Sequence, residues 1–484
     1  MRLRFHFPAV TGLALALGLT SCGNAPQARL IPPMNESYAE APQMARPATS
    51  PPRDLAGSAD VAATIQAPAQ YPLTPTPFLE HPESLRRFFA ALVDLDLGKR
   101  TDDVRVVQFG DSHTAADFQT GPLRRSLQRR FGDGGRGFVS VGKPWKYYVQ
   151  EGVQGSGMTG WSPERGHFAH GKFVGDGRYG LVGVSIAASQ HGARAYSDLV
   201  ASTSHIELAY LEAPRGGSFD VLVDGARVQR LRTAGDEAKS AYVGLDVTEG
   251  PHHVELDAVG DGAVRVFGMT LDRSKVGLTL DALGVNGARA GDLLLLREDH
   301  FGAELKHRDP ALVMLAYGTN ESTDDVPLDV YEKQLVDVLG RVARAAPAAA
   351  CLLLGPPDRA ERHHVVVPGA TAGGASSVQT VWTTVPRLLD IVAMERRVAA
   401  AAGCAYYSQL DAMGGPGSMA GWALEAPPRA MLDRTHLSRQ GYAELGDALA
   451  SDLVRAYETY RGSASPKGLE RSPPAPAAPA VASQ

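Results

Sequence analysis

The chain has 484 residues, of which 44% are hydrophobic and 21% charged, a composition typical of a globular protein long enough for two or three domains. It contains 48 Lys and Arg against 53 Asp and Glu, so its net charge is -5. Because the chain has no overall basic field, we expect no nucleic acid among its partners.

The first residues are typical of an export signal. Arg2 and Arg4 precede an apolar run over residues 7–19, which is shorter than the ~20 residues that span a bilayer. The run leads to Cys22 in a pattern that resembles a bacterial lipobox. We predict that residues 1–22 are a lipoprotein signal peptide and that Cys22 is lipidated. An ordinary signal peptide with a chance cysteine is the alternative.

A lipid on Cys22 would anchor the protein to a membrane. The following Gly23 and Asn24 do not resemble the Asp that often retains lipoproteins in an inner membrane. We therefore expect an exported lipoprotein at the periplasmic face of the cell envelope, in the outer membrane. Residues 23–76 are rich in Pro, Ala, Ser and Thr and are predicted to form a disordered tether, and residues 463–484 a disordered tail.

The folded part is predicted to begin with an α/β unit over residues 77–144. Residues 83–97 have a helical pattern, and residues 104–110 form a short apolar run ending in Gly, which indicates a buried strand. A further helix is predicted over residues 122–131. Strands that alternate with helices are typical of parallel α/β sheets.

Residues 145–272 have a different pattern. Short runs alternate apolar and polar side chains, with turns between them at regular spacing, which favours antiparallel strands. Asp224 and Gly225 join two such runs and predict a tight hairpin. About six strands of this kind predict a β-sandwich.

The α/β pattern returns over residues 273–462, so the sandwich is predicted to be inserted into one α/β domain. Alternating strands and helices predict a parallel sheet with helices on both faces. The predicted strands are residues 278–284, 311–317, 351–355 and 405–410. One helix is predicted to begin near residue 290, and three more are predicted over residues 331–345, 385–402 and 438–460. Residues 359–380 are predicted to be a loop.

Two cysteines remain after Cys22. Cys351 and Cys404 each open an apolar, strand-like run, and neighbouring parallel strands would bring them together. An exported protein meets an oxidising compartment, which favours a disulfide. Two buried free thiols remain the alternative.

Four short segments carry side chains suited to chemistry. Three of them follow predicted strands, and ligands bind beyond the carboxyl ends of the strands in open parallel sheets. The segments are Gly110-Asp111-Ser112-His113, Val285-Asn286-Gly287-Ala288, Gly318-Thr319-Asn320-Glu321 and, before the last predicted helix, Asp433-Arg434-Thr435-His436.

These segments together predict a serine nucleophile with its supporting groups. Ser112 needs a base to remove its proton, and His436 is the candidate, because histidine as a residue type is suited to proton transfer near neutral pH. Asp433 lies three residues before His436 and can fix the tautomer of its ring. The backbone N–H groups of Ser112 and Gly287 and the side-chain amide of Asn320 are the candidate donors of an oxyanion hole.

In this order the segments resemble blocks I, II, III and V of the SGNH/GDSL hydrolases, over residues 104–140 and 276–460. The resemblance implies a three-layer α/β/α, flavodoxin-like hydrolase domain in two parts, residues 77–144 and 273–462. It also implies a serine esterase that needs no cofactor. Block I has His113 where the family often has Leu.

The layout resembles bacterial peptidoglycan O-acetylesterases, which carry a carbohydrate-binding-like β-sandwich between blocks I and II. The resemblance implies an O-acylated cell-envelope polysaccharide as the substrate, with peptidoglycan as the expected polymer and acetyl as the acyl group. The same triad would serve a lipase or thioesterase acting on longer acyl chains, or a polysaccharide O-acetyltransferase. A glycan-binding lipoprotein without activity is the alternative outside the enzymes.

Other side chains were weighed and given structural interpretations. We expect His113 to pack beside the nucleophile turn, and no metal site at His363 and His364, which lack companion ligands. Four aromatic residues are expected in the sandwich core rather than on sugar rings, and four arginines on a solvated helix face. The aromatic residues are Trp145, Tyr147, Tyr148 and Trp161, and the arginines are Arg124, Arg125, Arg129 and Arg130.

Overall fold

The computed structural model describes residues 77–169, 172–367 and 376–464. The predicted signal peptide with Cys22, the predicted tether and residues 465–484 lie outside the described residues. Within these three described ranges, none of the helices combines the length and the apolar character needed to cross a membrane.

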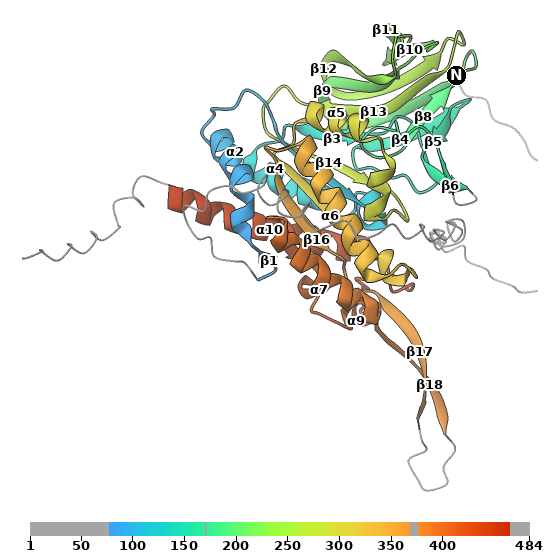
Figure 1. The fold of residues 1–484 in the computed structure, drawn as a ribbon. Helices are drawn as coiled ribbons and strands as arrows, with labels where there is room; N and C mark the ends of the chain where they lie inside the picture. Colours follow the sequence, from blue (N-terminus) through green and yellow to red (C-terminus); the bar gives the residue numbers. More distant parts are fainter. Residues whose placement is uncertain (1–76, 170–171, 368–375, 465–484) are drawn as a thin grey trace, which may run out of the picture. The chain divides into compact units, whose positions relative to one another are not determined.

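A six-stranded sheet forms the centre of the α/β part (Figure 1). Neighbouring strands are parallel except at one edge, where β1 pairs antiparallel with β19. The order β1-β19-β16-β15-β2-β14 places the five parallel strands in the flavodoxin-like arrangement, so the predicted fold class is confirmed. The strands are β1 (Leu79–Glu80), β2 (Val104–Gly110), β14 (Leu278–Gly284), β15 (Leu312–Ala316), β16 (Ala350–Gly355) and β19 (Ala405–Ser408).

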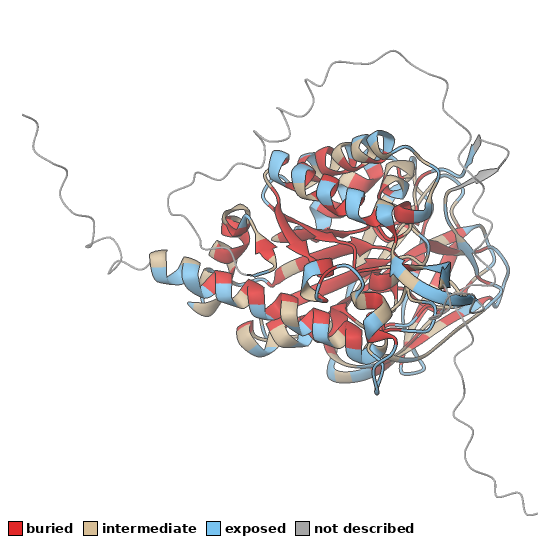
Figure 2. Cartoon of the chain, turned by 90° about the horizontal axis from the view of Figure 1, so that it is seen from below, coloured by how far each residue is buried: buried red, intermediate tan, exposed pale blue. Residues whose placement is uncertain are grey.

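Helices cover both faces of this sheet, and the buried strands lie between them (Figure 2). In β2, Val107 and Phe109 face one core and Val104 and Val106 face the other, because successive side chains of a strand alternate. One core is completed by α5 (Glu298–Arg308), α6 (Leu328–Ala345) and α7 (Pro386–Ala401), and the other by α2 (Arg86–Asp96), α4 (Thr120–Phe131) and α10 (Arg439–Ala464). Shorter helices are η1 (Pro82–Leu85), α3 (Ser112–Ala115), η2 (Ala290–Leu295), η3 (Glu321–Thr323), α8 (Gln409–Ala412) and α9 (Ser418–Trp422).

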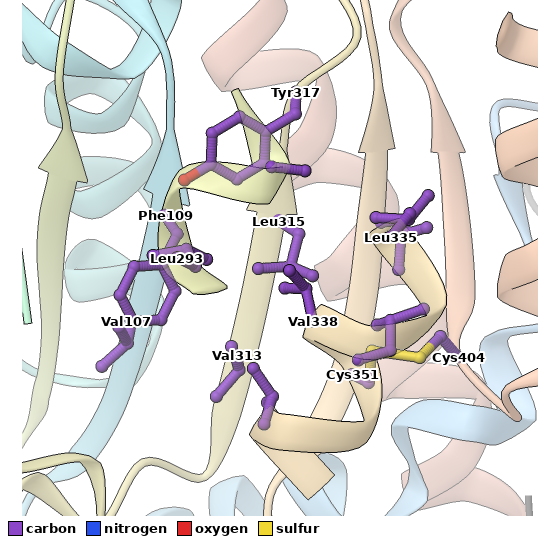
Figure 3. Close-up of a cluster of buried hydrophobic side chains, with 14 of the residues drawn as sticks. Val107, Phe109, Leu293, Val313, Leu315, Tyr317, Leu335, Val338, Cys351 and Cys404 are labelled. Atoms are coloured by element: carbon purple, nitrogen blue, oxygen red, sulfur yellow. A yellow bond between two sulfur atoms is a disulfide. The ribbon is translucent and has the colours of Figure 1, made fainter. Parts of the chain in front are cut away.

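A disulfide joins Cys351 and Cys404 in the first of these cores (Figure 3). Cys351 lies in β16, and Cys404 immediately precedes the neighbouring β19. The two Cα atoms are 4.7 Å apart. Pairing of neighbouring strands therefore brings the two cysteines together, and of the two interpretations of the sequence the disulfide is confirmed.

The second sheet is antiparallel and has its own apolar core. Its path is β11-β10-β12-β9-β13-β8-β5, and β3 and β4 pair with β13 and β9. Asp224 and Gly225 have φ of 53° and 80° between β10 and β11, which is the tight turn that the sequence predicts. The strands are β3 (Gly135–Val139), β4 (Val153–Thr159), β5 (Ser162–Glu164), β8 (Ser185–Ala188), β9 (Arg194–Glu212), β10 (Ser218–Val223), β11 (Ala226–Arg232), β12 (Lys239–Ala258) and β13 (Val264–Asp272); β6 (His167–Ala169) pairs with β7 (Lys172–Val174).

Strand β3 lies before residue 145, where we expected the β-rich part of the chain, the predicted sandwich over residues 145–272, to begin. It pairs with β13 through Val139 and Met269, and through Phe138 and Thr270. Its Gly-Arg-Gly-Phe-Val sequence has no apolar-polar alternation, because two of the five positions are glycine. The second sheet therefore takes its first strand from the segment that the sequence assigned to the α/β part.

Residues 359–380, predicted to be a loop, contain most of a β-hairpin. Strands β17 (Ala360–Val367) and β18 (Ser377–Thr384) pair antiparallel and project from the α/β part (Figure 1). Val365, Val366 and Val378 are exposed. Apart from Ala360 and Trp382 at its base, the hairpin is not packed in a core, so its sequence lacks the period-2 pattern by which strands are recognised.

Candidate active site

The turn after β2 presents Ser112 at the carboxyl edge of the parallel sheet. Asp111 accepts a 2.9 Å hydrogen bond from the backbone N–H of His113 and so caps the short helix α3, in which Ser112 is the first residue. Gly110 is required at the end of β2, since a Cβ there would lie 2.2 Å from Oγ1 of Thr114. Burial raises the pKa of Asp111 to about 6.

Asp433, His436 and Ser112 form a continuous hydrogen-bonded chain. The Oγ atom of Ser112 lies 3.0 Å from Nε2 of His436, and Nδ1 of the same ring lies 2.8 Å from Oδ2 of Asp433. Nδ1 therefore carries the proton and donates it to the carboxylate, while Nε2 is left to accept from Ser112. The structure brings together the three residues that the sequence proposed as a triad.

The second oxygen of Asp433 shapes the loop itself. Its Oδ1 accepts hydrogen bonds from the backbone N–H groups of Thr435 and His436, both at 3.0 Å, and Arg434, directly after Asp433, has a φ of 52°. Burial opposes ionisation of Asp433, yet the hydrogen bonds and charge of His436 hold the pKa of this carboxyl at about 2. Asp433 is thus ionised at neutral pH.

The predicted oxyanion donors come from three adjacent strands that end at the same level. Gly110 of β2 pairs with Gly284 of β14 on one side and Ala316 of β15 on the other. The loops carrying Gly287 and Asn320 therefore leave the sheet on either side of the Ser112 turn. Such a point, where the chain order reverses, is where ligands bind in this fold.

A buried carboxylate fastens these two loops together. Glu321 accepts 3.0 Å and 2.9 Å hydrogen bonds from the backbone N–H groups of Gly318 and Ala290. The side-chain amide of Asn320 donates to the carbonyl of Ala288 at 2.9 Å, which fixes the plane of the amide. Burial raises the pKa of Glu321 to about 7. The sequence motif contains Glu321, but nothing in it indicated this role.

The β-rich part also reaches the site, through Trp145. Its indole Nε1–H donates to Oδ1 of Asn286 at 3.1 Å, and Asn286 immediately precedes Gly287. Trp145 packs edge-on against Tyr148, with ring centroids 4.9 Å apart. We expected Trp145 in the core of the sandwich, and this is wrong: the side chain is partly buried against the core of the α/β part and bonds to the loop that carries Gly287.

The expectation of a solvated arginine face is wrong for Arg124. Its guanidinium is buried and donates to Asp117, with Nη2 3.0 Å from Oδ2. Arg136 from β3 meets the same carboxylate at 2.8 Å, because a fully buried charge requires partners. The sequence could not reveal this, since Asp117 lies outside the helix that carries Arg124. Arg125 is more exposed, as expected.

His363 and His364 lie on the hairpin strand β17 and are exposed. Among the described residues, no group of three or more His, Cys, Asp or Glu side chains is placed to hold a metal ion.

Residues 247–444 match the GDSL-like Lipase/Acylhydrolase family. A solved structure of a peptidoglycan O-acetylesterase is similar to this chain with 25% identity and a TM-score of 0.61, covering 78% of this chain and 96% of that one. The protein is an ester hydrolase similar to the GDSL-like family. The family match includes Gly287, Asn320, Asp433 and His436 but begins after Ser112, which joins them only in three dimensions.

Two further structures are more distant from this hydrolase. A family two carbohydrate esterase from Clostridium thermocellum, in complex with cellohexaose, is 12% identical with a TM-score of 0.25, covering 55% of this chain and 93% of that one. The corresponding values for a family two carbohydrate esterase from Cellvibrio japonicus are 11%, 0.23, 66% and 98%. These TM-scores are too low to establish a shared overall fold with this chain. No curated protein matches the sequence.

Proposed function

We propose that this hydrolase removes O-acyl groups, specifically O-acetyl groups, from a cell-envelope polysaccharide, and that the polysaccharide is peptidoglycan. The observation that carries the catalytic part is the chain Asp433–His436–Ser112, with contacts of 2.8 Å and 3.0 Å. Ser112 follows the strand that lies between the two strands whose loops carry the proposed oxyanion donors.

In the first half of the reaction, Ser112 Oγ attacks the ester carbonyl while His436 Nε2 accepts the serine proton. The N–H groups of Ser112 and Gly287 and the amide of Asn320 stabilise the negative oxygen of the tetrahedral intermediate. The intermediate collapses to an acyl-serine, and His436 gives its proton to the departing sugar oxygen, which leaves as a hydroxyl. In the second half, His436 takes a proton from water as the water oxygen attacks the acyl-serine, and it returns that proton to Ser112 Oγ as the acid is released.

Support for the substrate comes from three directions. The similar structure at 25% identity is a peptidoglycan O-acetylesterase. The second, β-rich sheet is connected to the oxyanion loop through Trp145, so it adjoins the reacting centre. The export signal and lipidation proposed for Cys22, which lies outside the described residues, would place the enzyme at the periplasmic face of the outer membrane, beside such a polymer.

One observation favours a second candidate, an acylhydrolase for longer chains. Leu432, directly before Asp433, is 78% exposed, and Leu424 in the same region is 79% exposed. Exposed leucines beside a catalytic loop are suited to contact an apolar acyl chain. The two candidates differ in how activity depends on acyl length.

The test is acetate release from O-acetylated peptidoglycan by protein lacking residues 1–22, beside Ser112→Ala. We expect release that disappears in the variant, and among p-nitrophenyl esters a preference for acetate. Rising activity towards octanoate with no acetate release from peptidoglycan would establish the longer-chain acylhydrolase instead. Turnover by Ser112→Ala equal to that of the unmodified protein would refute the catalytic assignment.

A further inference from the structure

A second connection joins the nucleophile turn to the histidine loop, separate from the contact between Ser112 and His436. It runs through the residue that follows each of them. The hydroxyl of Tyr442 on α10 lies 2.9 Å from Nδ1 of His113, the residue after Ser112. The same hydroxyl is hydrogen-bonded to the backbone of Leu437, the residue after His436. The side chains of His113, Tyr442 and Leu437 are all buried.

The direction of these hydrogen bonds follows from the donors available. The backbone N–H of Leu437 can only donate, so Tyr442 accepts there and gives its own single proton to Nδ1 of His113. His113 therefore carries its proton on Nε2. That atom is buried without a hydrogen-bond partner among the described residues, so Tyr442 makes the polar contact that holds the ring. Burial lowers the pKa of His113 to about 3, which keeps the ring neutral.

The ring held in this way lies against the catalytic histidine. The centroids of the His113 and His436 rings are 5.5 Å apart, with 34° between their planes. His113 packs against the His436 ring and, being neutral, does not repel the imidazolium formed in each half-reaction.

We propose that His113 and Tyr442 are positioning residues: a Leu437–Tyr442–His113 bridge that holds the nucleophile turn and the histidine loop in register and packs against His436. The proposal rests on the proposed function, because it requires Ser112 and His436 to be the reacting pair. The bridge explains why this chain has His rather than Leu after the serine, since Leu could not accept the tyrosine proton.

The test uses Tyr442→Phe, which removes only the bridging hydroxyl, with His113→Leu and His113→Asn. Asn offers an acceptor close to the position of Nδ1, whereas Leu restores the common family residue without one. We expect Tyr442→Phe and His113→Leu each to lower kcat on p-nitrophenyl acetate about tenfold, at unchanged KM, as one lost hydrogen bond implies. Labelling of Ser112 by a fluorophosphonate should slow in parallel. His113→Asn should stay within about threefold of the unmodified enzyme, and the double variant should be no slower than either single one.

Tyr457→Phe is the matched control. Tyr457 is also buried on α10, and its hydroxyl donates to Asp96 at 2.6 Å, on the α2 side of the core. Its loss should lower the melting temperature and leave kcat unchanged.

Unchanged kcat and labelling in Tyr442→Phe would overturn the proposal, as would His113→Asn slowed as much as His113→Leu. Ser112→Ala separates this outcome from failure of the proposed function. If that variant is inactive while Tyr442→Phe is normal, only the bridge is refuted. If Ser112→Ala retains turnover, the proposed function itself is wrong.

Discussion

Replacing Asp433 with Asn tests the proposed triad most sharply, because the two carboxylate oxygens do separate work. Oδ1 accepts the backbone N–H groups of Thr435 and His436, and Oδ2 accepts Nδ1–H of the His436 ring. An Asn whose carbonyl oxygen keeps the Oδ1 contacts leaves the loop intact. Its NH2 group then faces Nδ1 and forces the ring proton onto Nε2. Because Nε2 then carries a proton, it can no longer accept the hydrogen bond from Ser112.

The expected loss follows from this change of tautomer. An Asp→Asn change in a Ser-His-Asp triad lowers kcat about 10⁴-fold, and the Asp433 side chain is 31% exposed, which weakens its field on His436. We therefore expect kcat to fall about 10³- to 10⁴-fold, which corresponds to roughly 4–5 kcal/mol in the barrier.

The assay is steady-state hydrolysis of p-nitrophenyl acetate with thermal unfolding of each variant. Asp337→Asn is the matched control, because Asp337 forms an exposed ion pair with Lys333 on α6 and should leave kcat unchanged. Asp433→Asn should keep a melting temperature close to that of the unmodified enzyme. A kcat above one tenth of normal would show that Asp433 does not set the tautomer of His436.

Three further predictions concern the surroundings of the triad. Asn320→Ala should lower kcat about 10²- to 10³-fold with little change in KM, measured on the same ester, whereas a change in KM alone would remove Asn320 from the oxyanion hole. The double variant Cys351→Ala/Cys404→Ala should lose about 4 kcal/mol of unfolding free energy in urea titrations, since the disulfide spans a sequence separation of 53, and an equal stability would contradict this. For Glu321, burial raises the folded-state pKa from 4.5 to about 7, so its contribution is fully present below about pH 4.5 and is lost as pH rises through about 7. Between these pH values the unmodified protein should therefore lose roughly 3 kcal/mol more stability than Glu321→Gln, and parallel pH profiles in urea unfolding would refute the argument.

The sequence was most informative where chemistry is local. The apolar run over residues 104–110 that ends in Gly predicts a buried strand, which the structure has as β2, and Asp433 at three residues before His436 does contact the histidine ring. The helical pattern of residues 331–345 likewise lies within α6.

Features that depend on distant segments could not be predicted in this way. Tyr442 meets His113 across 329 residues, and no local pattern marks either residue as part of a pair. Arg124 is buried beside Asp117, on which Arg136 also converges. The hairpin strands β17 and β18 lack a buried face, so the hydrophobic period that identifies other strands is missing there.

The order of the strands also constrains how the enzyme is made. Val104 of β2 pairs with Leu278 of β14, and Val106 pairs with Leu312 of β15, so both neighbours of the nucleophile strand follow the whole β-rich part in the chain. Early in synthesis β2 has nothing to pair with, and contacts between such remote segments form slowly. His436 arrives later still, just before the last helix. A chain interrupted at any earlier point lacks a histidine to pair with its serine, so the hydrolase becomes active only as its final segment folds into place.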